Sequence, residues 1–561
     1  MKNFSRTVGD NQAPNKLQIA GWLLMIVCIG VGWKAVWLSQ DVFPFNADEA
    51  ITGLMARHIL QGAWPVFFYG QSYMGSLDAF LVAAFFRIFG DAVFPIRILQ
   101  ILLFSCTIIT TAALGKSIAY SWRTGLLAAL FLAVPAVHVT LYTTVSLGGY
   151  GEALLLSNGA YLCASLLHNR VTVCGFLKKM DWILVSLLGA ITGLGFWVFG
   201  ITLVATIPAV ILAFAAVVPI CKSKKSALVI LGVIFLIPFI LGSLPWWMAS
   251  LQNGVMPLIR ELSGSAIFIE GGSWFSRPAD HLFYFVFLGL PAVFGLRPSW
   301  EIRWLALPLL PIVLIGWGAA FWCFSKLLKT SLLPIRNNWY MLIGSVCLLI
   351  GGFLFTPFGL DPSGRYFLPL AVPLSLLLAW VITLTIKQQW IKISLVLFLL
   401  AYHAIGTWQS AMKNPPGITT QFDAISWIDH RYDEELMQFL RDTGETRGYS
   451  NYWVSYPLAF LSNEEIIFSP RLPYHADLRY TSRDDRYPKY TQMVQESEKI
   501  AYITTFNPAL DEKIKQVFTQ LGVSWKENSI GDYRIYYHLS RPVQPGEIDP
   551  SFASPNVENN E

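Results

Sequence analysis

Eleven long apolar segments dominate the sequence and restrict the folds that are open to it. A helix that crosses a membrane needs about 20 apolar residues, because the hydrocarbon core is about 30 Å thick and each helical residue rises about 1.5 Å. Each segment reaches this length or comes close to it, so the sequence predicts a multi-pass α-helical membrane protein. The segments are 17–38, 94–114, 124–141, 153–167, 182–199, 201–220, 227–247, 304–324, 339–355, 366–386 and 393–408.

The composition agrees with a chain that faces lipid. Hydrophobic residues make up 54% of the sequence and charged residues only 13%, against about 25% charged in a typical soluble protein. The net charge of +5 comes from short basic clusters between apolar segments, which argues against a nucleic-acid partner. The seven cysteines lie in apolar segments or in loops expected in the cytoplasm, so no structural disulfide is predicted, and no CxxC metal motif is present.

The distribution of lysine and arginine predicts the topology. With the N-terminus in the cytoplasm, every loop that follows an even-numbered segment is basic, as the positive-inside rule requires. The loops 40–93, 142–152, 248–303 and 356–365 then lie outside the cell membrane. Two shorter apolar stretches, 76–89 and 282–294, are expected to be helices at the outer interface. Lys34, near the outer end of the first segment, is expected to extend to that interface.

The composition changes after residue 410, which divides the chain into domains. Residues 1–410 form the predicted membrane module, whose first outer loop is 40–93, and 411–540 form a small extracytoplasmic α/β domain. A helix is expected at 433–443 and another after the Asn507 cap, with strands at 448–452, 501–506 and 533–537. The apolar stretch 454–461 completes this domain. The tail 541–561, rich in Pro, Asn and Glu, is expected to be disordered.

Several polar groups fall in the predicted outer loops. Asp48 and Glu49 begin a helical stretch, where acidic residues could simply cap the helix. Glu152 begins the fourth span, where capping is again the alternative. The catalytic candidates are therefore Asp48, Glu49 and Glu152, and the substrate-binding candidates are Arg57, Tyr69, Gln71, Tyr73, Arg365 and Tyr366. For Tyr69, Gln71 and Tyr73 the alternative is an ordinary turn, and for Arg365 it is an anchor in the aromatic belt.

Three blocks of sequence resemble a known family. They are residues 47–50 with 56–62 (ADEA and ARHILQG), residues 68–75 (FYGQSYMG) and residues 365–369 (RYFLP). In order and spacing they are similar to the GT-C glycosyltransferases, in particular the family 39-like bacterial relatives of protein O-mannosyltransferases and of the aminoarabinose transferase of lipid A. The resemblance covers about 17–386 and implies that Asp48 is the catalytic carboxylate, that Glu152 shapes the site and that Arg365 meets a polyprenyl phosphate. It fails at 75–78 (GSLD), where the relatives often carry Lys-Pro-Pro.

The resulting hypothesis is transfer of a hexose or pentose from a polyprenyl-phosphate donor to a lipid, glycan or protein acceptor in the cell membrane, with inversion. Asp48 would deprotonate the acceptor, Arg365 would stabilise the leaving phosphate, and Glu49 or Glu152 would orient sugar hydroxyls or a metal. No metal ligands are assigned, because the spacing of the carboxylates permits a divalent cation but fixes no coordination geometry. The alternatives are a transporter or flippase of a lipid-linked solute, whose ionisable groups usually lie near the midplane, and a membrane-anchored receptor.

Overall fold

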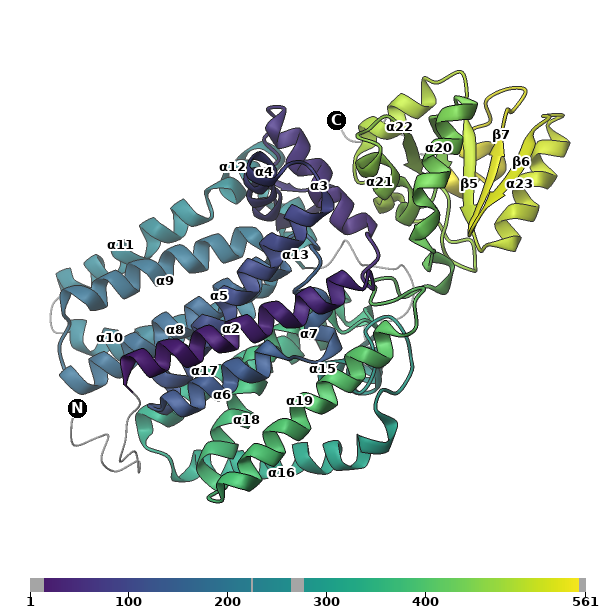
Figure 1. Cartoon of the computed structure of the whole chain (residues 1–561). Helices are drawn as coiled ribbons and strands as arrows, with labels where there is room; N and C mark the ends of the chain where they lie inside the picture. Colours follow the sequence, from purple (N-terminus) through teal and green to yellow (C-terminus); the bar gives the residue numbers. More distant parts are fainter. Residues whose placement is uncertain (1–14, 223–224, 264–276, 554–561) are drawn as a thin grey trace.

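The computed structural model describes residues 15–222, 225–263 and 277–553. A bundle of long helices is followed by a separate α/β domain, which lies beside one end of the bundle next to α3 and α4 (Figure 1). All eleven predicted spans are helical. They correspond to α2 (Lys16–Ser39), α5 (Val93–Ala119), α6 (Trp122–Ala133), α8 (Tyr150–Cys174), α9 (Lys179–Val198), α10 (Leu203–Cys221), α11 (Lys225–Gly242), α16 (Leu310–Thr330), α17 (Leu333–Phe355), α18 (Ala371–Thr385) and α19 (Gln389–Ala411).

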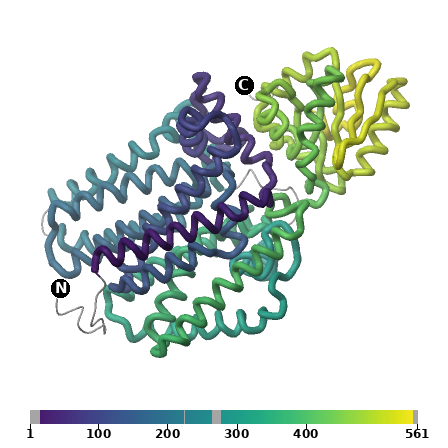
Figure 2. The backbone as a smooth tube through the Cα atoms, viewed as in Figure 1, coloured from purple at the N-terminus to yellow at the C-terminus, as the bar shows by residue number. Residues whose placement is uncertain are grey.

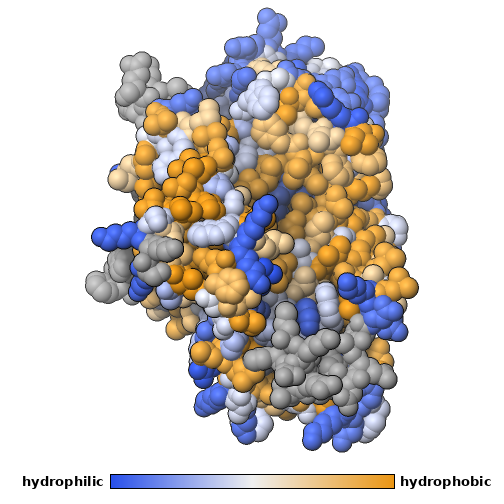
Figure 3. Space-filling model, turned by 90° about the vertical axis from the view of Figure 1, so that its left-hand side faces the viewer, coloured by the Kyte–Doolittle hydropathy of each residue, from blue (hydrophilic) through white to orange (hydrophobic). Residues whose placement is uncertain are grey.

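Within the described residues, nine helical segments are long and apolar enough to cross a membrane. Helix α6 is shorter because the chain leaves the helix at Val134–Pro135 and resumes as α7 (Val137–Tyr142). Helix α8 spans 25 residues and carries polar side chains such as Asn158 and His168 inside the bundle. The prediction of a multi-pass helical membrane protein is confirmed. Large apolar areas cover much of the face in Figure 3, with hydrophilic side chains at its top and bottom and in smaller groups between them.

Glycines on α9 allow close packing of the bundle. A Cβ atom on Gly189 or on Gly193 would collide with the backbone oxygen of Phe235 or of Phe239 on α11. In a membrane the hydrophobic effect does not drive helices together, because lipid is as apolar as the side chains. Small residues let the two backbones approach closely, and the helices are then held by dispersion contacts. Helices α9 and α11 therefore form a tightly packed parallel pair, since the contacts advance in the same direction along both helices, and they lie side by side in Figures 1 and 2.

The described parts of the four loops expected on the outer side lie at the end of the bundle that carries the α/β domain (Figure 1). Helices α3 (Ala47–Leu60) and α4 (Leu77–Phe89) and the short strands β1 (Phe67–Phe68) and β2 (Gln71–Gly75) form the first loop. The later loops contain α12 (Leu244–Asn253), α13 (Val255–Leu262), α14 (Arg277–Phe283), α15 (Leu290–Val293) and η6 (Arg365–Leu370). Helix α4 and the α14–α15 region occupy the two stretches predicted as short non-spanning helices.

The interpretation of Lys34 as a side chain that reaches the interface is wrong. Its side chain is 1% exposed, and Nζ donates to the Thr143 carbonyl at 2.5 Å, to Thr143 Oγ1 at 2.7 Å and to Thr144 Oγ1 at 2.9 Å. A buried ammonium needs such acceptors to offset the loss of water. Lys34 therefore ties α2 to the turn after α7.

The C-terminal domain is a five-stranded sheet in the order β4-β3-β5-β7-β6. Strands β4, β3 and β5 are parallel, while β7 is antiparallel to both β5 and β6. Helices α20 and α21 contribute to the core on one face, and α23 packs on Tyr502 and Tyr536 on the other. The elements are α20 (Asp433–Thr443), β3 (Arg447–Ser450), α21 (Tyr452–Leu461), β4 (Ile467–Pro470), α22 (Pro488–Gln495), β5 (Ala501–Thr505), α23 (Pro508–Gln520), β6 (Lys526–Ile530), β7 (Tyr533–Tyr537) and α24 (Pro545–Ile548).

Two expectations for this domain are corrected. The strand expected to reach Tyr452 ends at Ser450, because Asn451 caps α21 by accepting from the backbone N–H groups of Trp453 and Val454. Residues 541–553 are not disordered, since Val543 and Phe552 are fully buried against the domain. The remainder of the predicted tail, 554–561, lies outside the described residues.

Candidate active site

Asp48 lies where the first loop of the membrane module meets the C-terminal domain. The Asn46 side chain caps α3 by accepting from the backbone N–H of Glu49 at 3.0 Å, which places Asp48 in the first turn. The hydroxyl of Tyr452, the first residue of α21, donates to Asp48 Oδ1 at 2.5 Å. Burial and the Asp48 carboxylate raise the pKa of Tyr452 well above its ordinary value, so the phenol stays protonated and donates this hydrogen bond.

Two guanidinium groups lie in the same region. Arg365, at the start of η6, pairs through Nη2 with Asp361 Oδ2 at 2.7 Å and donates to the Tyr366 hydroxyl at 3.3 Å. Arg486, in the loop before α22, donates from Nη1 to the Gly70 carbonyl at 3.3 Å. In each of these arginines the Nε atom is buried and has no hydrogen-bond partner.

Tyr73 is the point on which these groups converge. Tyr73 is 7% exposed, and Arg365, Arg486 and Asp48 all lie within electrostatic range of its phenol. Burial raises the pKa of Tyr73. Gln71 extends the cluster: when its amide is oriented to match its donors, Oε1 accepts from Arg486 Nη1 at 2.8 Å and Nη2 at 2.6 Å, and from the Tyr73 hydroxyl at 3.2 Å. The structure thus brings together Asp48, Gln71, Tyr73, Arg365 and Tyr366 of the predicted residues.

The C-terminal domain contributes through the carboxyl ends of its parallel strands. Tyr452 follows β3, and Tyr474, Asp484 and Arg486 follow β4, all within electrostatic range of Asp48 or of one another. In open α/β sheets this edge is the usual place for a ligand. None of these four residues is among the residues predicted from the sequence. The strand followed by an Asn cap at 448–451 was the available signal for Tyr452, whereas no local pattern marks Arg486.

Glu49 does not reach this cluster. Arg97 engages both of its carboxylate oxygens, from Nε at 3.0 Å and from Nη2 at 3.0 Å, and Arg97 also donates to the Phe43 carbonyl at 3.1 Å. The Glu49 side chain is fully buried; burial raises its pKa and Arg97 opposes the shift. Glu49 therefore fixes α3 against α5 through Arg97, which engages both of its carboxylate oxygens.

Glu152 lies in a second buried group, against the carboxyl of Asp78. Asp78 accepts from Gln100 Nε2 at 3.0 Å and from the hydroxyl of Ser146. Burial raises the pKa of Asp78, which the Ser146 hydrogen bond opposes. These contacts join α4, α5 and α8 beneath the first loop. The placement supports a role for Glu152 in shaping the loops rather than in direct contact with substrate.

Arg57 and Tyr69, two of the predicted substrate-binding residues, lie where the membrane module meets the C-terminal domain. Arg57 donates from Nε to Asp91 Oδ2 at 2.7 Å and from Nη2 to the Phe460 carbonyl at 3.2 Å. Tyr69 stacks on Tyr487 with ring centroids 4.8 Å apart. Between them, His58 contacts the Tyr69 hydroxyl and Glu464 Oε1, each at 3.0 Å. These residues hold the C-terminal domain against α3.

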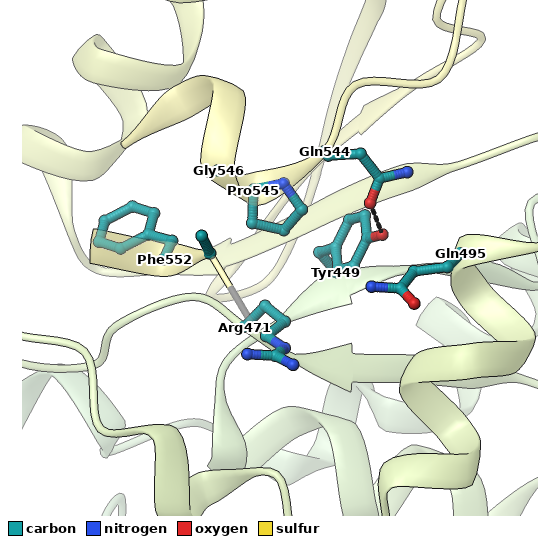
Figure 4. A pocket seen from close by; sticks show the side chains of 8 residues that line it. Tyr449, Arg471, Gln495, Gln544, Pro545, Gly546 and Phe552 are labelled. Atoms are coloured by element: carbon teal, nitrogen blue, oxygen red, sulfur yellow. Dashed lines mark hydrogen bonds between the residues drawn. The ribbon is translucent and has the colours of Figure 1, made fainter. Parts of the chain in front are cut away.

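No group of three or more His, Cys, Asp or Glu side chains that could hold a metal is found in residues 15–222, 225–263 and 277–553. A cavity of about 340 Å³ does lie within the C-terminal domain, away from Asp48. Tyr449, Gln495 and Gln544 point toward it together with Arg471, and the Tyr449 hydroxyl donates to Gln544 Oε1 at 2.6 Å (Figure 4). Asp485 pairs with Arg471 at 3.3 Å.

Asp484 makes the stability of this site depend on pH. Burial raises the pKa of its carboxyl to about 7, although Arg486 and His475 oppose the shift. An unfolded Asp has a pKa of about 3.9, so between these values the folded protein binds more protons and its stability falls as pH rises. We expect Asp484→Asn to remove this loss. Its melting temperature in detergent should exceed that of the wild type by a margin that grows from about pH 4 to about pH 7 and then stays constant, and parallel pH profiles would contradict the assignment.

No family model and no curated protein sequence matches the chain. Among solved structures, ArnT from Cupriavidus metallidurans bound to undecaprenyl phosphate aligns with a TM-score of 0.57 at 12% identity, over 93% of this chain and 98% of that chain. Its apo state gives a TM-score of 0.56 at 11% identity, over 92% and 98%. An oligosaccharyltransferase from Archaeoglobus fulgidus aligns at 0.48 and 13% identity, over 90% and 71%. The likeness to ArnT over nearly the whole of both chains shows that this protein has the GT-C fold.

Proposed function

We propose that this protein is a membrane glycosyltransferase that moves a sugar from a polyprenyl-phosphate donor to an acceptor on the extracytoplasmic face of the cell membrane. The observation that carries the proposal is the convergence of Asp48 and Arg365 around Tyr73. A carboxylate beside a cation meets the two needs of this chemistry, because the acceptor must lose a proton and the departing phosphate gains negative charge. A further support is the bound undecaprenyl phosphate of ArnT, a protein of the same fold.

In the proposed reaction the acceptor hydroxyl gives its proton to Asp48 while its oxygen attacks the anomeric carbon. The bond between that carbon and the phosphate oxygen breaks, and the phosphate keeps the electron pair next to the Arg365 guanidinium. A single attack from the opposite side inverts the anomeric centre. Tyr452 donates to one oxygen of Asp48 and so fixes the orientation of the carboxylate. Membrane lipid surrounds the module, the N-terminus is cytoplasmic and the C-terminal domain is extracytoplasmic.

The activity can be tested with the purified protein in detergent, incubated with undecaprenyl-phosphate hexoses and pentoses and with membranes as the source of acceptor. Transfer predicts the release of free undecaprenyl phosphate together with a glycosylated lipid, glycan or protein, both measured by mass spectrometry. A transporter or flippase would leave the donor intact. Absence of donor cleavage with every sugar and acceptor source would contradict the proposal.

A further inference from the structure

We infer that Arg486 of the C-terminal domain is a second phosphate-binding residue, so that the donor phosphate is held between the membrane module and the soluble domain. This inference rests on the proposed function and names a residue that the membrane module does not contain. Arg365 and Arg486 both interact with the Tyr73 phenol, one from η6 and the other from the loop before α22. They form the two cationic sides of one site.

The unpaired Nε atoms support this assignment. Arg365 and Arg486 each have a buried Nε–H without a partner, and an unsatisfied buried donor costs about 1–3 kcal/mol. A phosphate offers several anionic oxygens, and arginine binds such groups through two parallel N–H donors. One phosphate between the two guanidiniums would therefore satisfy both donors at once.

The surroundings hold Arg486 in place against the first loop. The Tyr456 hydroxyl accepts from its backbone N–H at 2.6 Å, and its guanidinium contacts the Gly70 carbonyl and Gln71. Gly70 has φ +70°, and a Cβ atom there would lie 2.7 Å from Arg486 Cδ. Only glycine both adopts this backbone conformation easily and admits the arginine, so the loop is shaped to receive Arg486.

The charge distribution favours the same conclusion. Residues 62–76 of the first loop contain no lysine or arginine. Arg365 is a cation of the membrane module that acts on Tyr73, and Asp361 already pairs with that side chain at 2.7 Å. A phosphate that approached Arg365 alone would meet a guanidinium whose charge is largely compensated. Asp48 and Asp484 act on Arg486 in turn, so each arginine has carboxylates near it, and Arg486 adds a second positive charge to that of Arg365.

The inference can be tested by measuring the affinity of the full-length protein in detergent for undecaprenyl phosphate and for undecaprenol, which differs only in lacking the phosphate. The dissociation constant for undecaprenol divided by that for undecaprenyl phosphate measures how much the phosphate contributes to binding. We expect Arg486→Ala to reduce this ratio about 10- to 100-fold, as loss of a charge-assisted contact does. Arg486→Gln, which can still donate to Gly70, should show a similar loss. The control Arg431→Ala removes an exposed arginine of the same domain that pairs with Asp429.

Each outcome decides the question. An unchanged ratio in both Arg486 variants, or an equal loss of affinity for the two lipids, would overturn the phosphate role and leave the proposed function standing. A wild-type protein that binds undecaprenol as tightly as undecaprenyl phosphate would instead count against the proposed function itself. A loss confined to the phosphate lipid, with Arg431→Ala unchanged, would establish Arg486 as a residue of the donor site.

Discussion

Replacing Asp48 with asparagine is expected to lower sugar transfer about 10²- to 10⁴-fold, the usual contribution of a general base. Asparagine keeps the size of the side chain and an oxygen that can accept from the Tyr452 hydroxyl, which lies 2.5 Å from Asp48 Oδ1 in the wild type. The variant therefore loses the proton acceptor while it keeps the local contact. The measurement is the initial rate of release of undecaprenyl phosphate, with the melting temperature as a check on folding.

Two further variants make the Asp48 experiment specific. Asp477→Asn applies the same chemical change to an exposed loop of the C-terminal domain and should leave the rate unchanged. Tyr452→Phe removes the hydrogen bond to Asp48 but retains the carboxylate, so its effect should stay within about tenfold, in line with the loss of one ordinary hydrogen bond. A near-normal rate in Asp48→Asn, or a larger loss in Tyr452→Phe than in Asp48→Asn, would show that Asp48 is not the base.

The bundle could be predicted from sequence because lipid imposes a strict rule on each helix by itself. A membrane helix must be long, apolar and internally hydrogen-bonded, and these properties are visible in any window of about 20 residues. The alternation of basic and non-basic loops then assigned to one side of the membrane the loops that lie near Tyr73 in the structure. Lys34 was misplaced for a related reason, since its acceptors on the turn after α7 lie more than 100 positions away.

The candidate site could be predicted only in part, because the type of a residue does not reveal which other residues its side chain contacts in the folded protein. Asp48 and Glu49 are neighbours in one helical turn, yet Glu49 faces Arg97 on α5 while Asp48 faces Tyr452, which is 404 positions away. Arg57 was predicted to bind substrate from its place in the first loop, and the sequence did not indicate its contact with the Phe460 carbonyl of the C-terminal domain. The partner of each side chain depends on which helix face packs against which neighbouring element, and this is decided by tertiary packing.

The contribution of the C-terminal domain was missed because it depends on docking. Arg486 lies in an irregular loop between β4 and α22, where no periodicity assigns it to a face. Its position becomes meaningful only when the carboxyl edge of the sheet is placed against the first loop. The contacts of Arg57, His58 and Tyr69 with the C-terminal domain hold it in that position, and the domain supplies Tyr452 and Arg486.

Replacing Arg365 with alanine should reduce transfer about 10²- to 10³-fold, as removal of a preorganised donor to a developing oxyanion does. Lysine should restore the rate only in part, because a point charge cannot form the planar pair of N–H donors. The rate of phosphate release at saturating donor measures the effect. Arg303→Ala, which removes an arginine that pairs with Glu301 in another loop at the same end of the bundle, should leave this rate near that of the wild type.

A companion double variant separates phosphate stabilisation from a merely structural role. Arg365 pairs with Asp361 Oδ2 at 2.7 Å, while Asp361 Oδ1 accepts from the backbone N–H of Ser363 at 2.8 Å. Alanine at 365 therefore leaves Asp361 with an unpaired charge, and adding Asp361→Asn removes that charge while it keeps an oxygen for Ser363. If Arg365 serves only to neutralise Asp361, the double variant should recover both stability and transfer. If it stabilises the leaving phosphate, stability should recover and transfer should remain low, because no guanidinium is left on that side of Tyr73.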